Sequence, residues 1–278
     1  MLEPGNVIEF DRKKYFKYVR QLGKGGTGTT YLFKDETTDM FFAIKKYTPI
    51  DIAHIDEDYI RFVDEIKILF RLSHPNIVRI YNYYLYPVSK VGYIQMEYID
   101  GVPINQFQAT LWGIDWGDIF TELISAFEYL EANKILHRDV RPANILIDNN
   151  FNIKIIDFGF GKKIDTDEQS INSIVLNWPV SQKPEEISKT IYTHQTEIFF
   201  VGKLFENLLG DELNQFRYRF ILEKMTEIKP DQRYLSFHEV SEAISTGMLM
   251  DASFSESEKE VYIAFADQLL YHTGLRQS

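Results

Sequence analysis

The amino-acid sequence predicts an α+β protein with two lobes, a small β-rich lobe that contains one helix and a larger, mainly helical lobe. Strand-like segments dominate the first hundred residues, whereas segments with the apolar spacing of helices dominate the rest. The stretch IDGVP, residues 99–103, has the composition of a linker between them. Such a layout predicts a ligand site in a cleft between the lobes.

We divide the chain into an N-terminal extension (1–14), a small lobe (15–98), the linker with the large lobe (99–247) and a C-terminal helical extension (248–278). In the small lobe, β-branched and aromatic residues separated by Gly and Asp turns predict strands at 15–22, 29–34, 40–47, 77–86 and 92–98. A helix is predicted at 59–72, because one face carries the apolar residues Phe62, Ile66, Leu69 and Phe70.

In the large lobe, apolar residues recur every three or four positions and predict helices at 118–132 and 196–209. The first of these faces is formed by Ile119, Leu123, Phe127 and Leu130. Ser236 and Glu239 have the spacing of a capping box and predict the start of a further helix. We expect a last amphipathic helix at 256–271, whose apolar face would pack back on the large lobe or bind a partner.

Composition excludes several classes of protein. The 278 residues include no cysteine, which excludes disulfides and thiol chemistry and fits a reducing, cytoplasmic location. A formal net charge of −11 argues against a general nucleic-acid binder. The start, MLEPGNVIEF, lacks the basic and apolar regions of a signal peptide, and no run of 18 apolar residues predicts a transmembrane helix.

Residues 22–31, LGKGGTGTTY, contain a G-x-G-x-x-G pattern made by Gly23, Gly25 and Gly28. Glycine lets the backbone approach phosphates closely, although a glycine-rich hairpin turn explains the pattern equally well. A dinucleotide-binding fold needs a helix directly after the glycines. The following residues, TTYLFKD, instead look like a strand. This pattern favours an arrangement in which a loop between two strands covers a nucleotide.

Lys45 lies among apolar residues in the strand-like stretch FFAIKK, and Glu65 lies on the following helix. Taken singly, Lys45 could be a lysine that keeps an edge strand soluble, and Glu65 could be a glutamate on the solvent-exposed face of a helix. Together they suggest an ion pair, because a lysine that reaches phosphates stays disordered unless a carboxylate holds it.

Residues 135–148, ILHRDVRPANILID, place Asp139 between Arg138 and Arg141, with Asn144 further on. A charged surface loop and a catalytic loop both fit this stretch taken alone. Asp157 emerges from the apolar run IKIIDFGFG, where a carboxylate is costly unless it is paired or bound to metal.

Taken together, these motifs resemble the eukaryotic-like protein kinase family, specifically a serine/threonine kinase catalytic domain, over roughly residues 15–247. RLSHPNIV, after the predicted helix, matches the same family. The resemblance implies transfer of the ATP γ-phosphoryl group to a protein serine or threonine hydroxyl. It implies that Asp139 orients that hydroxyl, that Asn144 and Asp157 hold Mg²⁺, with two ions expected, and that Arg141 contacts the phosphoryl group in place of the usual lysine.

The resemblance also implies an ATP pocket with Met96 as gatekeeper. Glu97, Tyr98 and Ile99 would form the hinge, and the backbone groups of Glu97 and Ile99 would reach adenine. His137 and Phe158 are expected to pack, with Leu69, as an apolar stack without a chemical role. The residues that the resemblance assigns to nucleotide binding are Leu22, Gly23, Gly25, Gly28, Ala43, Lys45, Met96, Glu97 and Ile99.

KPEE, residues 183–186, stands where the family has Ala-Pro-Glu, and the resemblance implies that Glu185 pairs with Arg233 of the large lobe. Other positions depart from the family pattern. Glu197 stands where the family has Asp at the start of a helix, and the segment between Leu209 and Arg233 is short, so a docking helix there is expected to be reduced or missing.

The activation segment, from Asp157 to Glu185, carries candidate phosphorylation sites and nearby acids. The acids could substitute for a phosphate opposite Arg138, or the segment could be a solvated loop. The candidate sites are Thr166, Ser170 and Ser173, and the acids are Asp165, Asp167 and Glu168.

Two other functions stay open. A pseudokinase that binds nucleotide as a scaffold is favoured by Arg141, Glu197 and the short large lobe. A small-molecule phosphotransferase of the same fold is disfavoured by Arg138 and by the Lys-Pro-Glu and Arg233 pattern. We expect a protein substrate, autophosphorylation in trans, no nucleic-acid partner and no membrane insertion.

Overall fold

The computed structural model describes residues 15–25, 28–47, 55–158, 162–163, 183–188, 191–251 and residue 261, without the side chains of 162–163 and 248–251. The predicted N-terminal extension, nearly all of the helix at 256–271, and Thr166, Ser170, Ser173 and the three nearby acids lie outside these residues. Within them, no helix is long and apolar enough to cross a bilayer.

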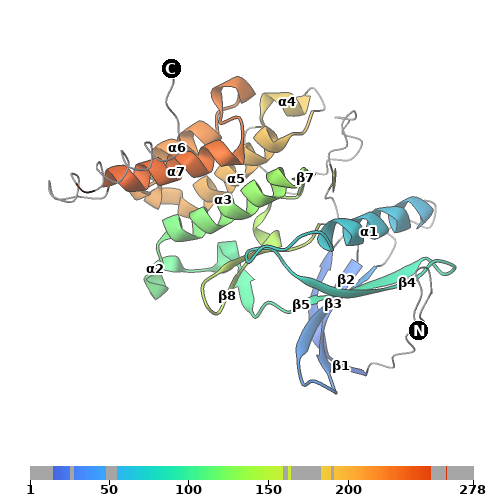
Figure 1. The fold of residues 1–278 in the computed structure, drawn as a ribbon. Coiled ribbons are helices and arrows are strands. Elements are labelled where there is room, and N and C mark those ends of the chain that lie inside the picture. The colour runs from blue at the N-terminus through green and yellow to red at the C-terminus, as the bar shows by residue number, and fades with distance from the viewer. Residues whose placement is uncertain are drawn as a thin grey trace.

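The small lobe is a five-stranded antiparallel sheet with the strand order β1-β2-β3-β5-β4, and Figure 1 shows helix α1 lying beside it. The strands agree with the predicted segments within a few residues. The elements are β1 (Phe16–Gly25), β2 (Gly28–Asp35), β3 (Phe41–Tyr47), α1 (Ile55–Leu69), β4 (Ile80–Tyr86) and β5 (Val91–Glu97).

Helix α1 buries Tyr59, Phe62, Ile66 and Leu69, which recur every three or four residues and so form one face. The predicted fourth member, Phe70, is 47% exposed, because the helix ends at Leu69 and turns the next side chain away from the core. The ring of Phe70 packs edge-on against Tyr83 of β4 instead. The acid Glu65 belongs to the buried face, where it is 3% exposed.

The large lobe is built from helices that pack side by side at the other end of the molecule (Figure 1). Its core is rich in phenylalanine: Phe120 contacts Phe205 with ring centroids 4.8 Å apart, and Phe127 stacks on Phe237 at 5.1 Å. The helices are α2 (Ala109–Trp112), α3 (Trp116–Ala132), α4 (Glu185–Ser188), α5 (His194–Leu209), α6 (Arg219–Met225) and α7 (Phe237–Asp251), with 3₁₀ helices at Ile104–Gln106, Pro142–Asn144, Gly210–Gln215 and Pro230–Gln232.

Two small sheets connect the helices of the large lobe to the small lobe. Strand β6 (Gly101–Pro103), which lies within the predicted linker, pairs with β8 (Ile145–Asp148), and β8 pairs with β9 (Ile153–Ile155). Strand β7 (Ile135–Leu136) pairs with β10 (Lys162–Lys163). The lobes also meet through the backbone, since Val78 N donates to Ile155 O at 2.9 Å and Ile155 N donates to Asn76 O at 2.8 Å.

Helix starts follow the capping chemistry with one difference from prediction. At α7, Ser236 Oγ accepts from Glu239 N at 3.1 Å, as a capping box requires. The Glu239 carboxylate, however, accepts from Leu235 N at 2.8 Å and not from Ser236 N, so the reciprocal bond reaches one residue further back. Between Leu209 and Arg233 the chain forms short turns of 3₁₀ helix and α6, which has seven residues.

The predicted ion pair between Glu185 and Arg233 is wrong by one residue. Both Oε atoms of Glu186 lie 2.6 Å from Arg233 Nη2, and Thr196 Oγ1 also donates to Glu186 at 3.0 Å. The amide of Glu185 donates to Ile228 O, which fixes the start of α4 and turns the next side chain into the core. Glu186 and Arg233 are 6% and 3% exposed, so this pair is buried.

Replacing Glu186 by Gln should lower the free energy of unfolding by about 3–5 kcal/mol, because Arg233 is then left as a buried cation without its carboxylate. Urea unfolding measures this change. The control is Glu212→Gln, which alters an exposed acid of the same lobe and should cost clearly less. Equal losses in the two variants would contradict this assignment.

Candidate functional site

Lys45 lies in β3, an inner strand of the sheet between β2 and β5. Strand β3 runs exposed Phe41, buried Phe42 to Lys45, exposed Lys46 and buried Tyr47. In the sheet, Lys45 is opposite Thr30 of β2 and Ile94 of β5. An ammonium that is only 5% exposed must be compensated by nearby carboxylates.

Two acids from different parts of the chain provide that compensation. Lys45 Nζ lies 2.8 Å from Glu65 Oε1 of α1 and 2.8 Å from Asp157 Oδ1, which follows β9. Burial alone would lower the pKa of Lys45, but Asp157 and Glu65 outweigh burial and hold this pKa above its ordinary value. Burial raises the pKa of Glu65, which Lys45 opposes and Asp157 reinforces.

A second cluster forms in the loop between β7 and β8. Asn144 Nδ2 donates to Asp139 Oδ2 at 2.7 Å and to Asp139 O at 2.9 Å, so the amide orients the carboxylate. Arg141 Nε lies 3.0 Å from the same Oδ2, in a geometry that gives an ion pair without a directed hydrogen bond. The two clusters are adjacent, because Ile156 N, next to Asp157, donates to Asn144 O at 2.8 Å.

The backbone beside both acids adopts an unusual conformation. Arg138 has a φ of 66° and Asp157 a φ of 63°, values that cost energy in residues other than glycine. Arg138 is held there by the carboxylate of Glu197, whose Oε1 accepts from Arg138 N at 2.8 Å. Glu197 is fully buried, and sequence reasoning identified it only as a departure from the family pattern. Its position at the start of α5, inside the apolar face, was the available signal.

Around these clusters, the expected packing residues share one hydrophobic core. The rings of His137 and Phe158 have centroids 4.7 Å apart, and both side chains are at most 1% exposed. Leu69 lies in the same core. The side chains of His137 and Phe158 are therefore surrounded by packing contacts, as expected for residues of the core.

The glycines differ in what they permit. A Cβ on Gly25 would lie 3.9 Å from Asp157 Oδ2, so the tip of β1 lies over this carboxylate. At Gly28 a Cβ would collide with the carbonyl of Lys46, because β2 and β3 approach closely there. Around Gly23 nothing lies within 4 Å of the Cβ position.

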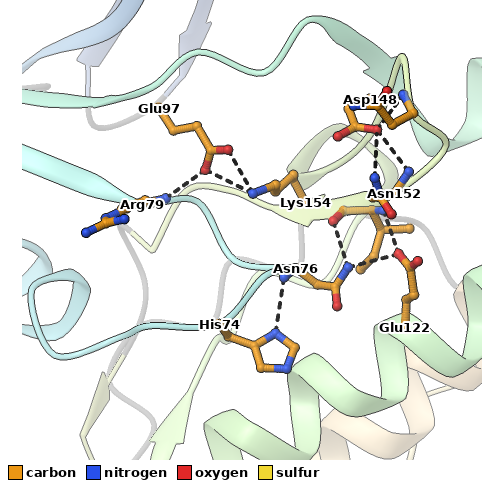
Figure 2. Close-up of polar contacts among 10 residues, drawn as sticks. His74, Asn76, Arg79, Glu97, Glu122, Asp148, Asn152 and Lys154 are labelled. Carbon is orange, nitrogen blue, oxygen red and sulfur yellow. Dashed lines mark hydrogen bonds and ion pairs between the residues drawn. The ribbon is translucent and has the colours of Figure 1, made fainter.

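Two further predicted nucleotide residues, Ala43 and Met96, lie on the same face of the sheet as Lys45, because Ala43 precedes Lys45 by two residues in β3. Ala43 is opposite Met96 in the β3–β5 pair, and both are buried. Leu22 and Ile99 pack against the same core. The structure adds one contact that the sequence did not reveal: the Glu97 side chain pairs with Lys154 of β9 (Figure 2).

Asn144 and Asp157 suit a magnesium ion by their chemistry. Mg²⁺ prefers oxygen ligands and takes one or two protein groups alongside waters and substrate phosphates. Asn144 directs its amide nitrogen to Asp139, which leaves the amide oxygen as its ligand atom. No group of three or more His, Cys, Asp or Glu side chains suited to a metal occurs in the described residues, so phosphate oxygens would have to complete the shell.

A β-sheet lobe that presents a buried lysine to one acid on its helix and another from a helical lobe has the architecture of protein kinases. The family model described as "Protein kinase domain" matches residues 16–260. The chain therefore belongs to the protein kinase family, as the sequence predicted.

Curated relatives agree with this family. Serine/threonine-protein kinase PrkC of Bacillus subtilis is 33% identical over 199 residues, which cover 70% of this chain and 30% of the relative. CTD kinase subunit alpha of Saccharomyces cerevisiae is 32% identical over 189 residues, covering 66% and 34%. Serine/threonine-protein kinase PAK 1 of Mus musculus is 30% identical over 195 residues, covering 69% and 34%. The matched part spans about a third of each relative.

Replacing Lys45 by Met should destabilise the protein more at neutral than at acidic pH. Without Lys45, burial and the charge of Asp157 raise the pKa of Glu65 further in the folded protein. In the unfolded chain, this pKa is about 4.3. The folded protein then retains a proton that the unfolded chain has released, so the free energy of unfolding falls as pH rises above about 4.3.

Urea unfolding from about pH 5 to pH 8 measures this deficit relative to the unmodified protein. Lys46→Met is the matched control, because Lys46 is the next residue of β3 and is exposed. A deficit that is the same at every pH, or that equals the control, would rule out the ion-pair explanation.

Proposed function

We propose that this chain is a serine/threonine protein kinase that transfers the γ-phosphoryl group of ATP to a protein hydroxyl. The observation that carries the proposal is the contact of Lys45 with both Glu65 and Asp157, beside the Asp139–Asn144 pair. The similarity to PrkC and PAK 1, both named serine/threonine-protein kinases, supports serine or threonine as acceptor. The protein substrate is unidentified, and autophosphorylation in trans and a cytoplasmic location belong to the same proposal.

Lys45 acts by position and charge. Its ammonium would contact the α- and β-phosphates, and Glu65 would keep it extended toward them. The buried location strengthens this interaction, because few waters compete with the phosphates for the ammonium. The backbone amides of Gly23, Gly25 and Gly28 would cover the phosphates from above.

Asp139 orients the attacking hydroxyl. Asn144 fixes its Oδ2, so Oδ1 is the atom that would accept the hydrogen bond from the serine or threonine. The hydroxyl oxygen forms a bond to the γ-phosphorus as the bond to the β–γ bridging oxygen breaks, and ADP leaves. The hydroxyl proton passes to Asp139 and then to solvent, while Arg141 would contact the transferring group.

Asn144 and Asp157 would hold magnesium, with two ions expected. Bound magnesium neutralises charge on the β- and γ-phosphates. The protein contributes by fixing both ligands: Asn144 through Asp139, and Asp157 through Lys45. Adenine would pack between Ala43, Leu22 and Met96, with the backbone groups of Glu97 and Ile99 as its hydrogen-bond partners.

One observation favours a pseudokinase as the second candidate. Arg141 sits 3.0 Å from Asp139 Oδ2 and partly neutralises the carboxylate that should orient the hydroxyl. Nucleotide would then bind without turnover. The buried Glu186–Arg233 pair follows the protein kinase pattern and gives no support to a small-molecule phosphotransferase.

Replacing Asp139 by Asn should lower kcat by roughly 100- to 10,000-fold, because the hydroxyl loses its proton acceptor. Transfer of labelled γ-phosphate from Mg·ATP to generic Ser/Thr and Tyr acceptor proteins, and to the kinase itself, measures this loss. The control is Asp211→Asn, which removes an exposed acid on the 3₁₀ helix after α5 and should leave kcat unchanged. Turnover by the Asp139 variant that equals the control would exclude the proposed role.

Magnesium should increase the stabilisation of the protein by ADP, and Asn144→Ala should reduce that increase. A ligand that binds only the folded state raises Tm, and at a given ligand concentration the rise is larger when the ligand binds more tightly. Thermal unfolding with ADP, with and without Mg²⁺, measures the effect independently of turnover. A normal shift in a protein that transfers no phosphate would establish the pseudokinase alternative, whereas no shift with nucleotide would exclude both.

A further inference from the structure

The carboxylate of Glu97, in the hinge, is held by groups from both lobes. Lys154 Nζ, from β9 of the large lobe, lies 2.8 Å from Glu97 Oε1 and 3.1 Å from Oε2. Arg79 N, just before β4 of the small lobe, donates to Glu97 Oε2 at 3.2 Å. Figure 2 shows these three residues converging. The Glu97 side chain thus connects the end of β5 with β9 and with the residue before β4.

The pair between Glu97 and Lys154 is protected from solvent more than an ordinary surface ion pair. The Lys154 side chain is 15% exposed and that of Glu97 is 26% exposed. The hinge backbone is fixed at the same point, because Glu97 N donates to Arg79 O at 2.8 Å. Side chain and backbone therefore constrain the peptide groups that would face adenine.

A second set of contacts acts on the following residues. Arg20 Nη2 of β1 donates to Tyr98 OH at 3.2 Å, and Tyr98 OH donates to Asp100 at 3.0 Å. Asn149, in the turn after β8, donates from its side-chain Nδ2 to Asp100 Oδ2 at 3.0 Å and from its backbone N to Asp100 O at 3.1 Å. These groups are exposed, so each bond contributes little, but they act on the same segment as Lys154.

Lys154 is also connected to the metal-binding end of the site. It lies three residues before Asp157, and between them Ile155 and Ile156 are bonded to Asn76 and Asn144 through their backbone amides. Strand β9 therefore places Lys154 and Asp157 at a fixed separation. The Lys154–Glu97 ion pair within β9 and the Lys45–Asp157 contact just after β9 would together set the hinge relative to the phosphates.

We propose that Lys154 is a positioning residue that sets the affinity for the adenine nucleotide by fixing the hinge through Glu97. This inference rests on the proposed function only in taking the hinge as the adenine site. It assigns Lys154 no contact with the nucleotide and no part in phosphoryl transfer. Its loss should therefore weaken nucleotide binding and leave the chemical step unchanged.

The test compares Lys154→Met with a matched control, Lys203→Met. Lys203 makes a similar ion pair with Glu206 on α5, at 2.7 Å and with side chains 17% and 25% exposed, away from the hinge. We expect Lys154→Met to raise the Kd for Mg·ADP and the KM for ATP by roughly three- to tenfold, with kcat unchanged. Lys203→Met should change none of these constants.

Glu97→Gln is the second variant, and it carries the test if Lys154→Met does not fold. It keeps the side-chain volume and an acceptor for Arg79 N, and it should weaken Mg·ADP binding as much as Lys154→Met. The double variant should be no weaker than either single one, because both remove the same interaction. Lys154→Arg, which keeps the charge, should restore most of the affinity.

Two results would overturn the proposal. One is a Kd for Mg·ADP that is the same in Lys154→Met, Glu97→Gln and the control. The other is a change in kcat with KM unaltered, which would make the pair a restraint on lobe movement. Binding of Mg·ADP is measured without turnover, so the two proposals can fail separately. If the variants lose affinity as expected but the protein transfers no phosphate, the proposed kinase activity is refuted and the positioning role of Lys154 is supported.

Discussion

The structure depends on one buried cation. Lys45 is placed in the interior by an inner strand of the sheet, and its charge is tolerated there because Glu65 and Asp157 lie 2.8 Å away. The three residues come from β3, α1 and the segment after β9, so this contact can form only when the sheet, its helix and the large lobe are all in place. The site is therefore a consequence of tertiary assembly, and no single element contains it.

Sequence patterns predicted the features that local chemistry determines. Periodicity predicted the five strands of the small lobe and helices α1, α3 and α5, and the spacing of Ser236 and Glu239 predicted the start of α7. The motifs of the family resemblance pointed to Lys45, Glu65, Asp139, Asn144 and Asp157 as the candidate site. The predictions were wrong where a shift of one residue along a helix decides whether a side chain is buried or exposed. Helix α1 ends at Leu69, which exposes Phe70, and α4 begins at Glu185, which turns Glu186 to Arg233. Such phases are set by backbone bonds to distant segments, as between Glu185 and Ile228, which no local pattern records.

Contacts between distant polar residues were also beyond the sequence. Glu197 holds the strained backbone of Arg138, and Lys154 holds Glu97, across intervals of 59 and 57 residues. A glutamate or lysine in an amphipathic segment is most often solvated, so neither position signals its partner. What the fold supplies is a rigid support: the phenylalanine-rich core around Phe120 and Phe205 fixes α3 and α5, and α5 carries Glu197.

The backbone of the described residues joins the lobes at two places: the covalent crossing at residues 97–100 and the hydrogen bonds of Asn76 and Val78 to Ile155. Two attachment points define a line, and these two alone would leave the small lobe only rotation about that line. The Lys45–Asp157 contact between the lobes adds a further restraint on this rotation. Displacement grows with distance from that axis, so Met96, next to one pivot, is carried least, and parts of the sheet far from both pivots travel furthest.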